Sequence, residues 1–234
     1  CICEKIRDPD GGYREAVIEG MKGEDRNGVV QCVLDVIADS TLDNREAAIR
    51  SLGTMHAPII GPAMIAIAEN ASDSSEVRAA AVYAFGREEK NHDALVGMAS
   101  DSDPVVQAEI MRALGYQTQS STARKIIKAQ LSSPESKVRA ASVEAWRMQK
   151  KDAGDEEICP IMMSDESPEV RIAAQMSFKF TTSRDSVRCL RERALLLEED
   201  SDVRDNMLYI LKNTRGDAEE PAYQVLCDAI PFWL

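Results

Sequence analysis

Aromatic residues, histidine and basic charge are scarce in this sequence. Only 5% of its 234 residues are Phe, Trp or Tyr, and only 2 are histidine. The 40 acidic residues outnumber the 28 basic ones, which gives a formal net charge of −12 at pH 7. A surface that binds nucleic acid or an anionic membrane needs clustered Lys and Arg, so this charge disfavours both kinds of partner.

Long apolar runs and paired cysteines are also missing. Because no run of about 18 apolar residues occurs, the sequence predicts no membrane span. The 6 cysteines form no CxxC pair and have no regular spacing, which disfavours a zinc site and a disulfide framework. We therefore expect a cytoplasmic protein whose free thiols pack as small hydrophobic side chains. Cys1 leaves two readings open: a trimmed start, which we favour, or a processed, lipid-modified cysteine.

What the sequence does contain is a repeat, whose clearest copy is VRAAAVYAFG, Val77 to Gly86. The first residue of this copy, the anchor, has counterparts at spacings of 29 to 33 residues: Tyr13, Asn44, Val106, Val138, Val170 and Val203. The residue after the anchor is arginine in six of seven copies, and Gln107 is the exception. The residue eight positions after the anchor is always large and apolar: Met21, Leu52, Phe85, Leu114, Trp146, Phe178 and Leu211. Such a fixed period predicts a repeat array.

Each copy has the periodicity of an amphipathic helix, because its apolar positions fall on one side at 100° per residue. Turn sequences such as SDSSE and SDSDP precede the copies, and their Asp, Ser and Pro residues are typical of helix starts. A further apolar run lies upstream of each turn: residues 32–38, 62–68, 93–99, 124–131, 156–163 and 189–197. Each period therefore predicts a helical hairpin in which the copy is the second helix.

The expected fold class is all-α, an α-solenoid in which about seven helical hairpins and a C-terminal helix form a right-handed superhelix. A single solenoid is expected over residues 1–234, with second helices that start near residues 13, 44, 77, 106, 138, 170 and 203. Residues 217–234 are expected to form a capping helix and tail, and a further repeat that has been cut short is the alternative.

The repeat unit D-x-x-P/S-E-V-R-x-A-A-x-x-A-L/F-G, as in SDSSEVRAAAVYAFG and SDESPEVRIAAQMSFK, resembles HEAT repeats of the short phycobilisome-lyase type. The resemblance covers nearly the whole chain. It implies an armadillo-type superhelix whose second helices line a concave face. It says less about function, because repeats of this kind serve many unrelated roles.

The recurrent arginine is expected to be structural. It lies on the flank of the apolar stripe, where a partly desolvated charge needs a partner. Aspartates in the preceding turns are candidates for that partner: Asp10, Asp43, Asp73, Asp103, Asp165 and Asp202. We interpret the arginines as a structural ladder of charge-assisted hydrogen bonds between turns and helices, made by Arg14, Arg45, Arg78, Arg139, Arg171 and Arg204. A catalytic or anion-binding role is the alternative.

No motif indicates catalysis, a metal or a cofactor. Deoxyhypusine hydroxylase, another HEAT array, ligates iron through His-Glu pairs at the start of second helices. This chain has Arg14-Glu15 and Arg45-Glu46 there, and arginine cannot ligate iron. His56 and His92 fall in connecting segments, so we expect ordinary loop residues. We therefore expect no catalytic residue, no metal site and no cofactor.

The polar side of the second helices is the candidate binding surface. Its rows six, nine and ten residues after the anchor mix Tyr, Arg and Met, which are enriched at interface hot spots. The partner-binding residues expected on the concave face are Tyr83, Arg87, Arg112, Tyr116, Arg147, Met176, Phe180 and Tyr209. A solvated helix face with incidental aromatic residues is the structural alternative.

The sequence thus predicts a noncatalytic scaffold that binds a protein or peptide partner, and self-association through the terminal repeats stays open. The resemblance implies one alternative, a bilin lyase-like or cofactor-attachment accessory subunit. A DNA-base glycosylase built on HEAT-like repeats is a third class, which the net charge of −12 disfavours.

Overall fold

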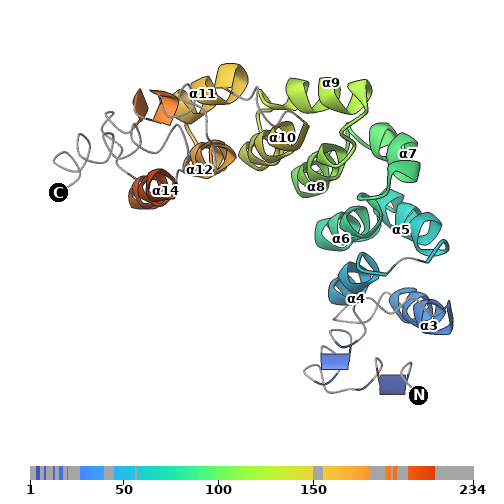
Figure 1. Cartoon of the computed structure of the whole chain (residues 1–234). Helices are drawn as coiled ribbons and strands as arrows, with labels where there is room; N and C mark the ends of the chain where they lie inside the picture. The colour runs from blue at the N-terminus through green and yellow to red at the C-terminus, as the bar shows by residue number, and fades with distance from the viewer. Residues whose placement is uncertain are drawn as a thin grey trace. The chain divides into compact units, whose positions relative to one another are not determined.

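The computed structural model describes a chain that is helical throughout its described part (Figure 1). The described residues are 27–39, 45–55, 57–149, 155–179 and 200–213, with short pieces at 4–5, 8, 13, 16–17, 20, 188–190 and 192–193. These residues contain no β-strand, which confirms the all-α class, and none of their helices is long and apolar enough to cross a membrane. The chain divides into two compact units, Cys1–Ala123 and Arg124–Leu234, which are described separately.

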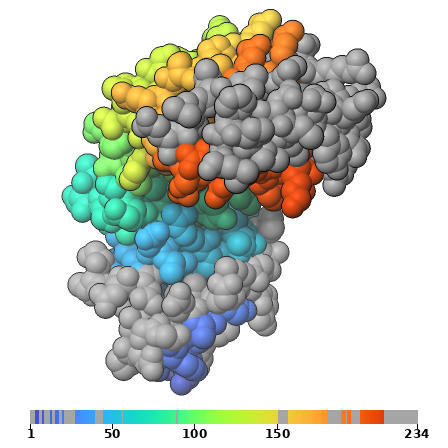
Figure 2. Space-filling view, turned by 90° about the vertical axis from the view of Figure 1, so that its left-hand side faces the viewer, coloured from blue at the N-terminus to red at the C-terminus, as the bar shows by residue number. Residues whose placement is uncertain are grey.

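The first unit consists of helical hairpins in two layers (Figure 1). Its second helices, α4, α6 and α8, pack side by side in one layer, and α3, α5 and α7 lie in the other. Figure 2 shows the same order at the surface, where the colours of these helices follow one another along the chain from blue to green. The helices are α3 (Asn27–Ile37), α4 (Arg45–Leu52), α5 (Ile60–Glu69), α6 (Ser75–Phe85), α7 (His92–Gly97) and α8 (Pro104–Gly115), with a 3-10 turn, η1, at Glu89–Asn91.

The second unit repeats this arrangement. Its second helices, α10, α12 and α14, pack in a row, and α11 packs against α12. The boundary between the units falls in the first turn of α9. The helices are α9 (Ser121–Gln130), α10 (Ser136–Gln149), α11 (Asp155–Ser164), α12 (Pro168–Ser177) and α14 (Ser201–Lys212).

The second helices start within two residues of the sequence anchors because the turns cap them. The side chain of Ser74 accepts a hydrogen bond from a backbone N–H in the first turn of α6. Asp103 and Asp200 do the same for α8 and α14. Pro104 and Pro168 stand at the first positions of α8 and α12, where a missing N–H costs nothing. The turn sequences therefore set where each second helix begins.

The large apolar column of the repeat forms the core. Its described members are at most 4% exposed: Leu52, Phe85, Leu114, Trp146, Phe178 and Leu211. Burial of one such side chain stabilises the fold by about 1.5–3 kcal/mol. The repeat therefore keeps this column because each copy packs one large side chain between its own hairpin and its neighbours.

Two glycines at the ends of second helices allow those helices to approach the next one closely. A Cβ added to Gly53 would lie 2.9 Å from the Ala84 Cα, and one added to Gly86 would lie 2.5 Å from the Ala113 Cβ. Gly86 caps α6, as the sequence suggests, but its φ is −70°. Lack of space, and not a left-handed backbone, is therefore the reason for glycine at Gly86.

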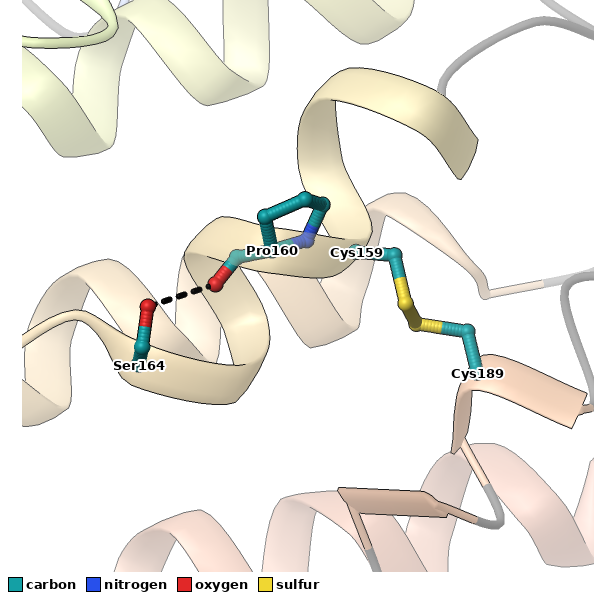
Figure 3. The surroundings of a disulfide bond; sticks show 4 residues. All are labelled: Cys159, Pro160, Ser164 and Cys189. Atoms are coloured by element: carbon teal, nitrogen blue, oxygen red, sulfur yellow. Dashed lines mark hydrogen bonds between the residues drawn. A yellow bond between two sulfur atoms is a disulfide. The ribbon is translucent and has the colours of Figure 1, made fainter.

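The expectation of free thiols is wrong for three cysteines. Cys159 of α11 and Cys189 form a disulfide whose Cα atoms are 6.0 Å apart (Figure 3). Cys32 of α3 is also disulfide-bonded. Beside the first bond, the Ser164 hydroxyl donates to the Pro160 carbonyl oxygen at 2.9 Å (Figure 3). The disulfide links the first helix of one repeat to the start of the next repeat's first-helix segment.

Several predictions fall outside the described residues: the capping segment 217–234, Asp10, Arg14, Met21, Asp43, His56 and Phe180. The single solenoid over residues 1–234 stays a prediction.

Candidate functional site

The recurrent arginines reach in two directions, as Arg45 illustrates. Its Nε donates to the carbonyl oxygen of Ile37, at the end of its own repeat's first helix, at 2.6 Å. Its Nη atoms pair with Asp73, in the turn before the next second helix, with 3.2 Å between Nη2 and Oδ2. One guanidinium thus joins two helices to a turn of the following repeat.

Arg78 makes the same contacts, and its partner, like that of Arg45, lies in the following turn and not in the preceding turn that the sequence suggested. Its Nε donates to the Ala68 carbonyl oxygen at 2.9 Å, and its Nη atoms pair with Asp101, with 3.4 Å between Nη1 and Oδ1. Asp103 is occupied differently: it caps α8 and accepts a hydrogen bond from the Ser75 hydroxyl. That hydrogen bond is the largest cause of the lowered pKa of Asp103, and two backbone N–H groups add to it.

Arg139 shows the contacts with the best geometry. Its Nε and Nη2 donate to the two carboxylate oxygens of Asp165 at 2.8 Å and 2.9 Å, and its Nη1 donates to the Ser133 carbonyl oxygen at 2.9 Å. Both charged side chains are only 10% exposed. The hydrogen bonds to Asp165 are the largest cause of the raised pKa of Arg139. Removal of either partner would leave a buried, unpaired charge.

The other described positions of the recurrent arginine keep some of these contacts. Gln107 donates to the Ala99 carbonyl oxygen at 3.3 Å, so it keeps the backbone contact of the column. The following turn, residues 132–135, contains no aspartate, and its carboxylate is that of Glu135. Arg171 donates to the carbonyl oxygens of Asp165 and Glu166 at 2.9 Å and 3.1 Å, and Arg204 lies in the first turns of α14.

Three of the predicted partner-binding residues meet in the first unit. The Arg87 guanidinium carbon lies 5.0 Å from the ring centroid of Tyr83 and 5.1 Å from that of Tyr116. On the other side, the Arg50 guanidinium carbon lies 5.4 Å from the Tyr83 ring. These four residues, which we call the Arg–Tyr stack, cross the second-helix layer from α4 to the end of α8. Each cation–π contact at an exposed site contributes about 0.5–1 kcal/mol.

The local structure explains why these side chains meet. Gly53 lets the end of α4 approach α6, and an added Cβ there would lie 3.2 Å from the Tyr83 ring. The turn that carries Arg87 is held from both sides. Asn91 Nδ2 donates to the Phe85 carbonyl oxygen at 2.7 Å, and Gln117 Nε2 donates to the Glu88 carbonyl oxygen at 3.3 Å. Arg87 therefore stands on a well-anchored turn.

The other described site residues lie on α8 and on the second helices of the second unit. Arg112, on α8, pairs with Glu109 at 3.4 Å. In the second unit, Arg147 is exposed on α10 and Met176 is half-buried on α12. Tyr209, on α14, is 47% exposed, and the Lys179 ammonium lies 5.0 Å from its ring centroid. Arg50 and Lys179 were not among the predicted site residues, although both stand in the rows six and nine residues after the anchor.

Metal ligands do not gather in the described part of the chain, where no group of three or more His, Cys, Asp or Glu side chains could hold a metal ion. His92 is not a loop residue as expected, because it begins α7, and its Nε2 lies 3.2 Å from the Ser120 hydroxyl. His56 lies outside the described residues.

Comparison with known proteins supports the fold. No protein-family model and no curated protein matches the chain. Among solved structures, the chain is similar to the complex of CpcE and CpcF of phycocyanin lyase from Nostoc sp. PCC7120, with a TM-score of 0.58 and 15% identity over 99% of this chain and 93% of that one. It is also similar to YibA of Escherichia coli, with a TM-score of 0.57 and 17% identity over 97% and 90% of the two chains.

At these identities the similarity concerns the fold alone. It confirms that the fold is an all-α solenoid of the kind that the repeat unit predicted.

Proposed function

We propose that the chain is a noncatalytic interaction scaffold that binds a protein or peptide partner on the face formed by its second helices. The observation that carries this proposal is the Arg–Tyr stack, in which Arg50, Tyr83, Arg87 and Tyr116 alternate across three neighbouring second helices. Tyr and Arg are the residues over-represented at binding hot spots, and Tyr116 is 41% exposed in the free chain.

The energies of these contacts also favour a role in binding over a role in fold stability for the Arg–Tyr stack. Exposed cation–π contacts stabilise a fold only modestly, whereas the apolar column already supplies a large core. A stack of rings on a rigid layer loses little side-chain entropy when a partner covers it. The net charge of −12 makes a protein or peptide a better partner than nucleic acid or an anionic membrane.

A triple variant tests this function. Tyr83→Ala, Arg112→Ala and Tyr116→Ala together should abolish the capture of native partners from an extract of the source organism, compared protein by protein by mass spectrometry. The melting temperature should fall only modestly, because exposed cation–π contacts are lost while the buried column stays intact.

The matched control replaces exposed residues outside the second helices. Ile59→Ala and Lys125→Ala should leave both capture and melting temperature as in the unaltered chain, since Ile59 precedes α5 and Lys125 lies on α9. Equal capture by the triple variant and the control would contradict the proposed binding surface.

The arginine column is proposed to be structural, as a ladder that ties each repeat to the next. Arg45, Arg78 and Arg139 support this, because their carboxylate partners belong to the fold and both partners are largely buried. The guanidinium N–H donors of these arginines are already used within the fold, so they are not available to bind a ligand.

A bilin lyase-like or cofactor-attachment accessory role is the second candidate, favoured by the fold similarity to the phycocyanin lyase complex. Coexpression with a bilin and its acceptor protein tests it by absorption spectroscopy. A coloured adduct that depends on this chain would support the role, and an unchanged spectrum would count against it.

We propose an oxidising compartment in place of the cytoplasm. The cytoplasmic expectation rested on free thiols, but Cys32, Cys159 and Cys189 are disulfide-bonded. Such bonds persist in secreted and periplasmic proteins and are rare in reducing compartments. Treatment of freshly lysed cells of the source organism with a thiol-alkylating reagent tests this proposal. Modification of Cys159 or Cys189 would show a free thiol and would contradict the oxidising compartment.

A further inference from the structure

Arg87 differs from Arg45, Arg50, Arg78 and Arg139 in what holds its charge. Arg45, Arg78 and Arg139 each pair with an aspartate, and Arg50 pairs with Glu46 at 3.0 Å. Within the described part of the chain, the Arg87 guanidinium contacts two tyrosine rings and makes no ion pair or hydrogen bond.

Nearby carboxylates do not compensate this charge, because they already have cations of their own. Glu88, the next residue, pairs with Lys90 at 2.6 Å, and Glu46 pairs with Arg50. Arg87 instead presents its N–H donors to solvent from an anchored turn.

The chemistry of a stacked guanidinium defines a ligand. Contact with aromatic rings uses the flat face of the group and leaves the N–H donors at its edge available. Those donors match the two oxygens of a carboxylate, which they bind in a bidentate manner. The rings of Tyr83 and Tyr116, whose centroids lie 5.0 Å and 5.1 Å from the guanidinium carbon, can cover apolar side chains of the same ligand.

We infer that the Arg–Tyr stack binds an acidic peptide segment of the protein partner, in which one Asp or Glu carboxylate is held by Arg87 and flanking apolar side chains pack on Tyr83 and Tyr116. This inference rests on the proposed function, because it specifies the partner's chemistry at the same surface. The net charge of −12 repels a ligand with many negative charges, so a lone carboxylate among apolar residues fits better than a polyanion.

An array of immobilised peptides tests the inference with the full-length chain as the probe. The peptides come in matched sets that share Leu and Phe flanks and differ at one central residue, which is Glu, Gln or phosphoserine. The chain should bind Glu members and should bind their Gln twins about tenfold more weakly or worse, because the charge-assisted hydrogen bonds are lost.

Variants at Arg87 assign the effect to the stack. Arg87→Gln should reduce Glu-peptide binding by about tenfold, and Arg87→Lys, which keeps the charge but loses the planar fork, should restore only part of it. Lys125→Gln, which removes an exposed positive charge from α9, is the matched control and should change nothing. Circular dichroism should show that all three variants are folded.

Three results would overturn the inference: equal binding of Glu and Gln peptides, binding of none of the peptides, or equal losses in Arg87→Gln and Lys125→Gln. Binding of phosphoserine members alone would replace the acidic peptide with a phosphorylated one.

Native-partner capture separates this inference from the proposed function. If capture survives Arg87→Gln but not the triple variant, only the acidic-peptide inference fails, and if capture survives the triple variant, the proposed function fails.

Discussion

Single side chains tie each repeat to the next, and Arg139 shows how much such a contact contributes. Its guanidinium binds both oxygens of Asp165 and a backbone carbonyl oxygen, so three parts of the fold depend on one residue. Gln107 shows that the column tolerates a neutral residue when the following turn lacks aspartate. Arg45, Arg78 and Arg139 each have an aspartate partner in the following turn.

Arg139→Leu should destabilise the protein by about 3 kcal/mol, because it leaves Asp165 buried without its counter-charge. Urea denaturation followed by circular dichroism measures the loss. Arg147→Leu, an exposed position on the same helix, is the control and should change stability by less than about 0.5 kcal/mol. Equal effects of the two substitutions would contradict the role of the pair.

Gly86→Ala should cost about 2 kcal/mol, since the added Cβ would lie 2.5 Å from the Ala113 Cβ and 2.7 Å from the Val82 carbonyl oxygen. Gly97→Ala is the matched control on α7, where nothing lies within 4 Å of an added Cβ. The control should be neutral or stabilise by up to about 1 kcal/mol, because alanine favours the helix. Thermal unfolding of the two variants compares them, and a neutral Gly86→Ala would refute the close approach.

Ser75→Ala should destabilise the protein at neutral pH and lose this effect in acid. The Ser75 hydroxyl is the largest cause of the lowered pKa of Asp103. A folded-state pKa below the unfolded value gives stability that is present above the unfolded pKa, about 3.9, and is lost as the pH falls through the folded pKa. Urea denaturation at neutral pH and below about pH 4 measures the difference between the chains. An equal difference at both pH values would be inconsistent with this hydrogen bond.

Secondary-structure elements are where the sequence was most informative. Leu52, Phe85, Leu114 and Trp146 recur at one position of a helical period, and all are buried, because the apolar stripe of each helix must pack against its neighbours. The Asp and Ser residues of the turns cap helices for local reasons that the sequence also contains.

What the sequence did not reveal depends on contacts between repeats. Asp101 and Asp103 are both turn aspartates, and only the packing of α6 on α8 decides that Arg78 pairs with the first. Cys159 and Cys189 carried a usable signal, because their separation of 30 is close to one repeat and equivalent positions of adjacent repeats lie side by side. Of the candidate site, the sequence supplied Tyr83, Arg87 and Tyr116, but it could not show that their side chains stack.

The Cys159–Cys189 disulfide should stabilise the second unit by about 3–4 kcal/mol, as expected for a closed loop of this length. Cys159→Ala, Cys189→Ala and the double variant should therefore lose about the same stability, because either single change already breaks the bond. Chemical denaturation of the three variants measures this. Additive losses in the double variant would indicate that the cysteines act only through packing.

At the scale of the whole molecule, the repeats divide the work between buried and exposed positions. The apolar column and the arginine ladder hold neighbouring hairpins together. The column is large and apolar in every copy, and the ladder position is arginine in six of seven. The positions six, nine and ten residues after the anchor do vary, and in the first unit they place Arg50, Tyr83, Arg87 and Tyr116 in contact. Stability in such arrays is summed over neighbours, so variation at exposed positions leaves the fold intact.

Site-specific photocrosslinking shows which face meets the partner. A photoreactive phenylalanine analogue is placed at Tyr83 in one chain and at Ile59, which is 39% exposed and lies beside α5, in another. Each chain is irradiated in an extract of the source organism, and adducts are identified by mass spectrometry. A scaffold that binds through the Arg–Tyr stack predicts a defined adduct from position 83 that Arg87→Gln weakens, and little or none from position 59. Adducts of equal yield from both positions, or from position 59 alone, would contradict it.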